Sequence, residues 1–250
     1  MSADMTFSKQ ELDKYLNELG KEFRRLNGKN AHAEIILIGG ASIVINYDFR
    51  SMTNDADALI YTDAVMKDSI NRVRDKHRLS HGWLNEDFKR TKSFTEKLRG
   101  VSIPYRTFSN TLHIRTIAAE YLIAMKAMSG RQYKFDLSDI VGILWEHEKR
   151  GASINKETVS KAVFELYGTQ SLPDISEQFL NAVFSNDTGY AEIYNEARKK
   201  EIEAKEILLE VQKRNPDMMN RDNLDDIISL AVRKREQSKA SIPDEDDVFS

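Results

Sequence analysis

Cysteine is absent from this chain of 250 residues. Without thiols the protein has no disulfide framework, no zinc–thiolate site and no cysteine nucleophile. No apolar run approaches the roughly 20 residues of a membrane-spanning helix. Residues 1–4 also lack the basic and then apolar layout of a signal peptide. The sequence therefore predicts a cytoplasmic protein with no membrane partner.

A strong excess of either charge sign is missing as well. The chain has 37 Lys and Arg against 40 Asp and Glu, which gives a formal net charge of -3. Proteins that coat nucleic acid are usually basic, so this class is disfavoured. A local basic patch beside a cleft remains compatible with this composition.

Apolar residues follow two different periods along the chain, and the change falls near residue 117. Short apolar or alternating runs predict strands at 35–38 and 55–61 and two more within 93–117, with Pro104 near a strand start or an edge. Beyond residue 117 no strand is predicted. Helical spacing is found at residues 7–26, 41–47, 63–76, 118–129, 136–149, 155–167, 175–185, 190–214 and 223–235.

These periods predict an α+β fold in three parts. Residues 1–117 form a small mixed β-sheet with flanking helices, and residues 118–241 form a helical region that completes the functional site. Residues 242–250 are acidic and without periodicity, which predicts a mobile tail. The helix at 190–214 carries both charge signs, so we expect it to be a solvated helix rather than a nucleic-acid-binding one.

Two adjacent glycines, Gly39 and Gly40, follow the first predicted strand and precede an apolar helix start. Glycine lets the backbone approach a ligand closely, and the first turn of a helix attracts anions. This pattern predicts a phosphate-binding turn. The alternative is a tight turn that only connects a strand to a helix.

Two aspartates, Asp55 and Asp57, open the next predicted strand. Residues two apart on a strand point to the same side, so both carboxylates address one point. They repel each other unless a cation lies between them, and hard oxygen ligands suit Mg²⁺. The alternative is a pair of solvated charges at a strand edge. A metal site beside a phosphate-binding turn would suit a nucleoside triphosphate.

At this point the sequence resembles a known family. The order strand, double glycine, helix and Asp-x-Asp looks like the core signature of the polymerase-β-type nucleotidyltransferase superfamily. More narrowly, Arg50-x-x-Thr53-x-Asp55-x-Asp57 resembles the bacterial branch that includes the AbiEii-like toxins and related uncharacterised nucleotidyltransferases. The resemblance covers roughly residues 31–145. Three later segments also match that branch: Trp83-Leu84-Asn85, the helix that carries Lys126, and Arg131-x-x-Lys134-x-Asp136-x-x-Asp139.

The resemblance implies a role for each of these positions. Gly39, Gly40 and Ser42 would hold the triphosphate, and Lys126 would contact its phosphates. Asp55 and Asp57 would bind Mg²⁺ or Mn²⁺. Arg50 and Thr53 would support the site, Thr53 as a hydrogen-bond donor to a carboxylate. Either Asp136 or Asp139 would complete the active site.

Each of these later positions also has a plainer interpretation. Ser42 is suited to a helix start, and Arg50 and Thr53 to a loop salt bridge and a loop turn. Lys126 lies beside an apolar helix face, where a lysine can extend its ammonium to solvent. Asp136 is suited to cap the helix that begins there, with Asp139 at the third helical position. We interpret Trp83-Leu84-Asn85 as a structural brace of the sheet.

One departure from the superfamily pattern leaves two functions open. A third acidic residue is expected on the strand after Asp-x-Asp, yet residues 101–117 contain neither Asp nor Glu, and Glu96 is the nearest candidate. If Asp136 or Asp139 takes that place, the resemblance implies transfer of a nucleoside monophosphate to a hydroxyl of RNA (tRNA) or of a protein. It also implies a toxin controlled by an antitoxin partner. The alternative is a catalytically inactive module that senses nucleotides or binds a partner.

Overall fold

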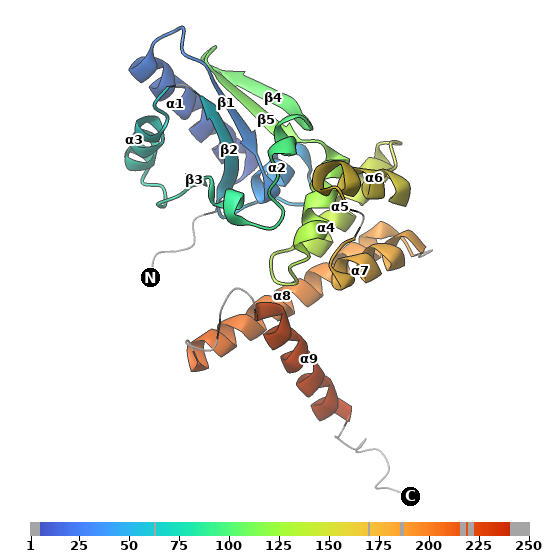
Figure 1. Ribbon diagram of the computed structural model, residues 1–250. Coiled ribbons are helices and arrows are strands. Elements are labelled where there is room, and N and C mark those ends of the chain that lie inside the picture. Colours follow the sequence, from blue (N-terminus) through green and yellow to red (C-terminus); the bar gives the residue numbers. More distant parts are fainter. Residues whose placement is uncertain are drawn as a thin grey trace, which may run out of the picture.

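The computed structural model describes residues 6–62, 64–169, 171–185, 188–215, 219 and 223–240. It confirms the predicted α+β class, with a five-stranded mixed sheet first and a set of helices after it (Figure 1). The predicted tail at 242–250 lies outside the described residues. No helix in the described part of the chain is long and apolar enough to cross a membrane. The strands are β1 (Ala33–Leu37), β2 (Ala56–Thr62), β3 (Leu84–Asn85), β4 (Ser102–Phe108) and β5 (Leu112–Ile117).

Strand β1 is the centre of the sheet, whose order is β3-β2-β1-β5-β4. It pairs antiparallel with β2 and parallel with β5. Pro104 lies in the edge strand β4, as predicted, and the register of β4 against β5 shifts between Pro104 and Arg106. At the C-terminal end of β1, the N–H of Ile38 donates to the backbone carbonyl of Asp57 at 2.8 Å. The first residue after β1 therefore lies beside the strand that carries Asp57.

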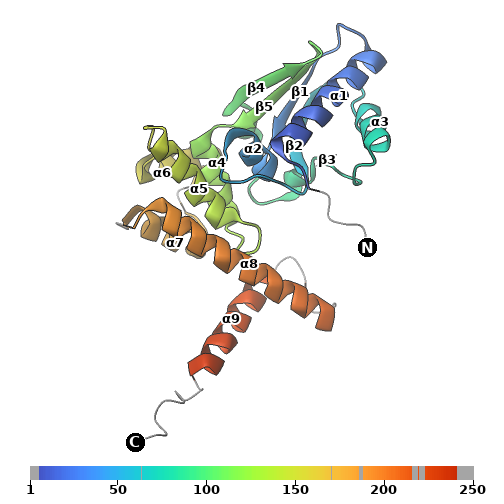
Figure 2. The same ribbon diagram turned by 180° about the vertical axis from the view of Figure 1, so that it is seen from behind.

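Helices α1 (Lys9–Asn27) and α3 (Lys67–His77) cover one face of the sheet (Figure 2). Ser8 begins α1 with a capping box that includes Glu11, and the apolar stripe of the helix is buried. Trp83 is fully buried against α1, with its ring 6.1 Å from that of Tyr15. This position confirms the expected bracing role of the segment around Trp83. Helix α3 begins at Lys67, later than the predicted start at residue 63, which is not described.

The other face of the sheet packs on helices of the second half in one shared core. Leu59 of β2 and Ile36 of β1 join this core with apolar side chains of α4 and α5. The long helix α8 crosses α5, and α9 projects away from the body (Figure 1). The remaining helices are α2 (Gly39–Asn46), α4 (Ala119–Ser129), α5 (Asp136–Lys149), α6 (Lys156–Tyr167), α7 (Asp174–Ser185), α8 (Tyr190–Arg214), α9 (Leu224–Ala240) and the short 3-10 helices η1 (Asp87–Arg90) and η2 (Glu96–Arg99).

The loop between α2 and β2 is fixed to α5 by two contacts. A side chain at Gly142 would bring its Cβ within 2.5 Å of the Phe49 ring, so the ring occupies the space that this glycine leaves. Glu146, one turn further along α5, accepts the backbone N–H groups of Asp48 and Phe49 at 2.7 and 2.9 Å. This loop carries Arg50, so its attachment to α5 decides where Arg50 points.

We expect Gly142→Ala to destabilise the protein by about 1–3 kcal/mol, because the new methyl group overpacks the Phe49 ring. In a Phe49→Ala background the same substitution should be neutral or stabilising, since alanine favours a helix over glycine by about 1 kcal/mol. Urea unfolding of the four proteins measures both effects. An equal cost in both backgrounds would contradict the proposed contact.

Candidate active site

Gly39 and Gly40 are the first two residues of α2, directly after Ile38, which follows β1, and we call this segment the glycine turn. Gly39 has a φ of 55°, in the left-handed region that glycine adopts without strain, and a Cβ there would meet nothing within 4 Å. At Gly40 a Cβ would lie 2.5 Å from Oγ1 of Thr53 and 3.0 Å from a guanidinium nitrogen of Arg50. The space beside Gly39 at the start of α2 is thus open. At Gly40 the missing side chain leaves room for Thr53 and Arg50 of the loop between α2 and β2.

Asp57 is the second residue of β2, and Asp55 directly precedes the strand, which begins one residue later than predicted. Asp55 is exposed, and Asp57 is half-buried on the strand face that also carries Leu59, toward α4 and α5. The pKa of Asp57 is raised to about 6, first by burial and then by the negative charge of Asp55, while Arg131 and Lys134 act in the opposite direction. The pair is therefore a concentration of negative charge that its surroundings compensate only in part.

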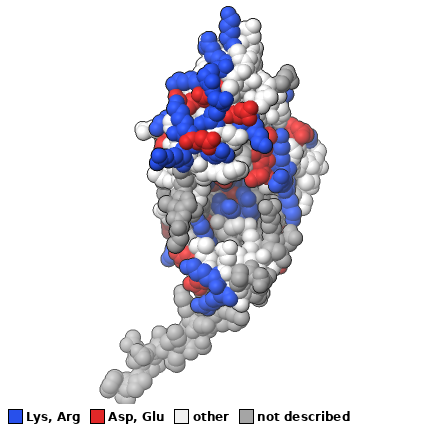
Figure 3. All heavy atoms as spheres, turned by 90° about the vertical axis from the view of Figure 1, so that its left-hand side faces the viewer, with Lys and Arg blue, Asp and Glu red and all other residues white. Residues whose placement is uncertain are grey.

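The loop between α4 and α5 supplies the basic side of this region. Its Arg131 and Lys134 are the cations whose charges act on Asp57. In Figure 3, Lys and Arg side chains are visible in the hollow between the sheet part of the molecule and the helices below it. Acidic and basic side chains thus face each other across the candidate site.

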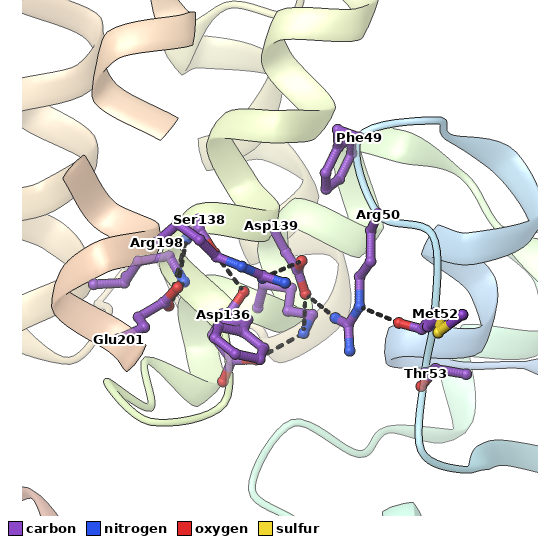
Figure 4. Close-up of polar contacts among 12 residues, drawn as sticks. Phe49, Arg50, Met52, Thr53, Asp136, Ser138, Asp139, Arg198 and Glu201 are labelled. Carbon is purple, nitrogen blue, oxygen red and sulfur yellow. Dashed lines mark hydrogen bonds and ion pairs between the residues drawn. The ribbon is translucent and has the colours of Figure 1, made fainter. Parts of the chain in front are cut away.

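Lys126 is the centre of a buried ion-pair network behind that surface. Its Nζ lies 2.8 Å from Oδ1 of Asp136 and 2.9 Å from Oδ2 of Asp139. A guanidinium nitrogen of Arg50 contacts the same oxygen of Asp139 at 2.6 Å, as Figure 4 shows. Nε of Arg131 lies 2.9 Å from the second oxygen of Asp136. Two carboxylates one turn apart on α5 therefore bind cations from three separate segments.

The electrostatics of this network favour the charged forms. Burial alone would lower the pKa of Lys126, but the charges of Asp136 and Asp139 more than offset it, so the pKa is raised. Burial alone would raise the pKa of Asp136, and the charges of Lys126 and Arg131 lower it instead. Both aspartates have 0% exposure, so each carboxylate depends on these cations.

This geometry decides between several interpretations of the sequence. The ammonium of Lys126 does not extend to solvent but ends between two buried carboxylates. Asp136 does not cap α5, because the N-cap residue is Phe135 and no side chain of that residue caps the helix. Arg50 forms the salt bridge to Asp139 rather than one confined to its own loop.

Ser42 and Thr53 lie close to the turn, with their hydroxyls directed inward. Ser42 is fully buried, and its Oγ accepts the N–H of Ile117 on β5 at 3.4 Å. Oγ1 of Thr53 donates to the backbone carbonyl of Asp55 at 3.1 Å. The prediction that this hydroxyl donates to a carboxylate is wrong, because the chain turns sharply enough between the two residues to present a carbonyl instead.

In the described part of the chain no third carboxylate forms a metal-binding group with Asp55 and Asp57, although the charge of Asp87 on η1 also raises the pKa of Asp57. Glu96 lies on η2, where its charge acts on Tyr61 near the opposite end of β2. Asp136 and Asp139 are occupied by Lys126 and the arginines around it. Among the described residues, no group of three or more His, Asp or Glu is arranged to hold a metal ion.

One residue of this region, Glu201 of α8, was not found from the sequence. It is 2% exposed and accepts the N–H of Leu137, in the first turn of α5, at 2.8 Å. The pKa of Glu201 is raised to about 7, chiefly by burial and also by the charge of Asp139, although the hydrogen bonds from Ser138 and Leu137 lower it. Its helical spacing with the buried Ala197 and Ala204 is a signal that could have identified it.

We expect Lys126→Met to destabilise the protein by about 3–5 kcal/mol, because it leaves two buried carboxylates without their shared cation. The matched control is Lys205→Met on the exposed side of α8, which should be close to neutral. Chemical unfolding of both variants measures the difference. Equal stability of the two would show that Lys126 is not needed to balance the network.

Glu201→Gln should change how stability depends on pH. The ordinary pKa of the carboxyl is 4.5 and the folded value is about 7, so between these values the unfolded state releases a proton that the folded state keeps. The wild type should therefore lose up to about 3 kcal/mol relative to Glu201→Gln as pH rises through this range, with no further loss above it. Melting curves at several pH values test this, with Glu203→Gln as control. A stability difference that stays constant with pH would contradict the raised pKa.

Comparison with known proteins identifies the family of this chain. A search of curated proteins and of solved structures finds no match. A family model described as "Nucleotidyltransferase of unknown function (DUF6036)" matches residues 14–169, which is more than half of the chain and includes every site residue predicted from the sequence. The match confirms the predicted nucleotidyltransferase family and does not extend to the AbiEii-like branch. The chain belongs to this family of nucleotidyltransferases of unknown function.

Proposed function

We propose that the protein is a Mg²⁺- or Mn²⁺-dependent enzyme that transfers a nucleoside monophosphate from a nucleoside triphosphate to an acceptor hydroxyl. The observation that carries this proposal is the juxtaposition of the glycine turn with the aspartate pair. Because Ile38 donates its N–H to the backbone carbonyl of Asp57, the open backbone at Gly39 directly follows a residue that is hydrogen-bonded to Asp57. A triphosphate bound at the turn would extend over Asp55 and Asp57.

The donor set at the start of β2 fits a hard cation that is shared with a substrate. Mg²⁺ in phosphoryl-transfer sites is commonly held by one or two carboxylates together with substrate phosphates. Asp55 and Asp57 supply two carboxylates, and burial together with the charge of Asp55 raises the pKa of Asp57, so a bound cation would stabilise its ionised form. A bound ion would supply Lewis-acid stabilisation of the reacting phosphoryl group.

The remaining roles follow from position. Backbone N–H groups at the first turn of α2, where Gly39 is open, would bind phosphate oxygens. Arg131 and Lys134 face Asp57 and would stabilise charge that develops on the phosphates during transfer. Ser42 and Lys126 are buried, so we assign them the task of holding α2 and α5 in place beneath this surface.

In the transfer step, the acceptor hydroxyl oxygen would bond to the α-phosphorus as the bond to pyrophosphate breaks. The likeness to the AbiEii-like branch supports an acceptor on RNA, such as the 3′ end of a tRNA, or on a protein side chain. It also supports a biological role in the cytoplasm as a toxin that an antitoxin protein controls. The basic hollow in Figure 3 is compatible with a polyanionic acceptor.

A second candidate function is a module that binds a nucleotide or a partner protein without turning a substrate over. One observation favours it: Asp136 and Asp139 are held by Lys126, Arg50 and Arg131, and no third carboxylate joins the aspartate pair in the described part of the chain. Such a protein would bind the triphosphate and leave it intact.

Asp57→Asn should lower transfer by on the order of 10² or more, because it removes a ligand for the ion that stabilises the transition state. Asp75→Asn, at an exposed aspartate of α3 on the other face of the sheet, is the matched control and should keep wild-type activity. Labelled triphosphates incubated with total cellular RNA or with lysate would show the transferred label, and chelator should abolish it.

Three outcomes of this experiment separate the candidates. Transfer by the wild type that is lost in Asp57→Asn supports the enzyme. Metal-dependent binding of the triphosphate without transfer supports the binding module. Wild-type turnover by Asp57→Asn would contradict the proposed metal site.

A further inference from the structure

Helix α8 is not the solvated charged helix that its sequence predicts. One stripe along it faces the candidate site, and we call it the α8 contact stripe: Tyr194, Arg198, Glu201, Ala204 and Leu208. These residues are spaced four, three, three and four positions apart, so they share one face of the helix. Together they contact three segments of the site, namely the loop that carries Arg50, the start of α5 and the loop between α4 and α5.

The first residue of the stripe, Tyr194, holds the loop that carries Arg50. Its hydroxyl donates to the carbonyl of Phe49 at 3.2 Å, and its ring meets the Phe49 ring edge-on at 5.7 Å between centroids. The loop is thus fixed by α8 on one side and by Gly142 and Glu146 of α5 on the other.

Arg198 holds a strained residue at the start of α5. Phe135 has a φ of 60°, which is uncommon for a bulky side chain and persists only where neighbouring groups fix it. The guanidinium of Arg198 lies 3.6 Å from the centroid of the Phe135 ring and donates to Oγ of Ser138 at 3.3 Å. It also lies 4.0 Å from Oδ1 of Asp139, a buried atom without a hydrogen bond to any described residue.

Glu201 completes the first turn of α5, where backbone N–H groups have no partner within the helix. It accepts the N–H of Leu137 at 2.8 Å and that of Ser138 at 3.4 Å, so a residue of another helix does the work of a cap (Figure 4). Further along the stripe, Ala204 and Leu208 pack with Tyr133, which lies between Arg131 and Lys134.

We propose that Arg198 and Glu201 are positioning residues of the candidate site, and that α8 is therefore a required part of it although it lies beyond the family match at residues 14–169. Released from α8, the strained Phe135 would relax, and the start of α5 would carry Asp136 and Asp139 away from Lys126. The loop with Arg131 and Lys134 would then lose its place opposite Asp57. As far as it concerns nucleotide binding, the inference rests on the proposed function.

Hydrogen exchange of the full chain, without any ligand, tests whether α8 fixes the start of α5. Glu201→Ala should speed exchange of the amides at residues 135–139 by at least about tenfold, while amides of α1 and α6 keep wild-type rates. Glu201→Gln should restore slow exchange, because its amide oxygen accepts the same N–H groups. Glu203→Ala, on the exposed side of the same helix, is the matched control and should match the wild type.

Arg198→Met provides a second variant, because this side chain is partly exposed and its loss leaves no buried charge on α8 unpaired. It should also speed exchange at residues 135–139. Unchanged local exchange in both Arg198→Met and Glu201→Ala would overturn the proposal. A uniform increase over the whole chain would overturn it too, since it would show a general loss of stability.

Binding of a fluorescent nucleoside triphosphate with Mg²⁺ tests whether Arg198 and Glu201 position the site for nucleotide binding. Glu201→Ala and Arg198→Met should weaken binding by at least about tenfold, and Glu201→Gln should bind like the wild type. If Glu201→Ala and Arg198→Met show faster local exchange but bind the triphosphate with wild-type affinity, the positioning role is overturned. A wild type that binds no triphosphate would overturn the proposed function, and the exchange comparison would still decide whether α8 fixes the start of α5.

Discussion

The ion pairing of one buried lysine with two buried carboxylates is the constraint on which the rest of the site depends. A charge in the interior is tolerated only when it is paired and hydrogen-bonded, and removing one partner is costly. Lys126 comes from α4, its carboxylates from the first turn of α5, and their other partners from the loop before β2 and the loop before α5. These four segments must therefore come together for the buried charges to be paired.

This constraint has a consequence for charge as well as for shape. Arg50, Lys126 and Arg131 outnumber the two carboxylates that they share, so the network keeps an excess of positive charge. That excess lies behind a surface whose own carboxylates, Asp55 and Asp57, are undercompensated. A bound metal–triphosphate pair carries both signs and would complement both parts of the site.

Much of the fold could be predicted because its signals are local. The apolar period of each helix and the run before Gly39 lie within a few residues, and the apolar run after Asp57 predicts β2 to within one residue of its start. The partners of buried charges could not be predicted in the same way. Whether Asp136 caps a helix or pairs with Lys126 depends on tertiary contacts, and a helix start fits both equally well.

The residues that were missed show the same limit. Glu201 contacts Leu137, which is far away in the sequence, and Glu146 likewise contacts the backbone of Asp48. Within its own helix, Glu201 is one charge among many of both signs, which is typical of a solvated helix. Only its spacing with Ala197 and Ala204 distinguishes it, and that spacing does not show which helix Glu201 contacts.

The two edges of the sheet limit how this protein can associate with others. A free strand edge is a template on which a second chain can add a strand, which is one route to both recognition and aggregation. Here β3 has only two residues, and β4 is interrupted by Pro104 and by the irregular register that follows it. Neither edge offers a long row of free backbone groups. Extension of the sheet by a second copy is thus disfavoured, and docking through helices is the route that this architecture leaves open to a protein partner.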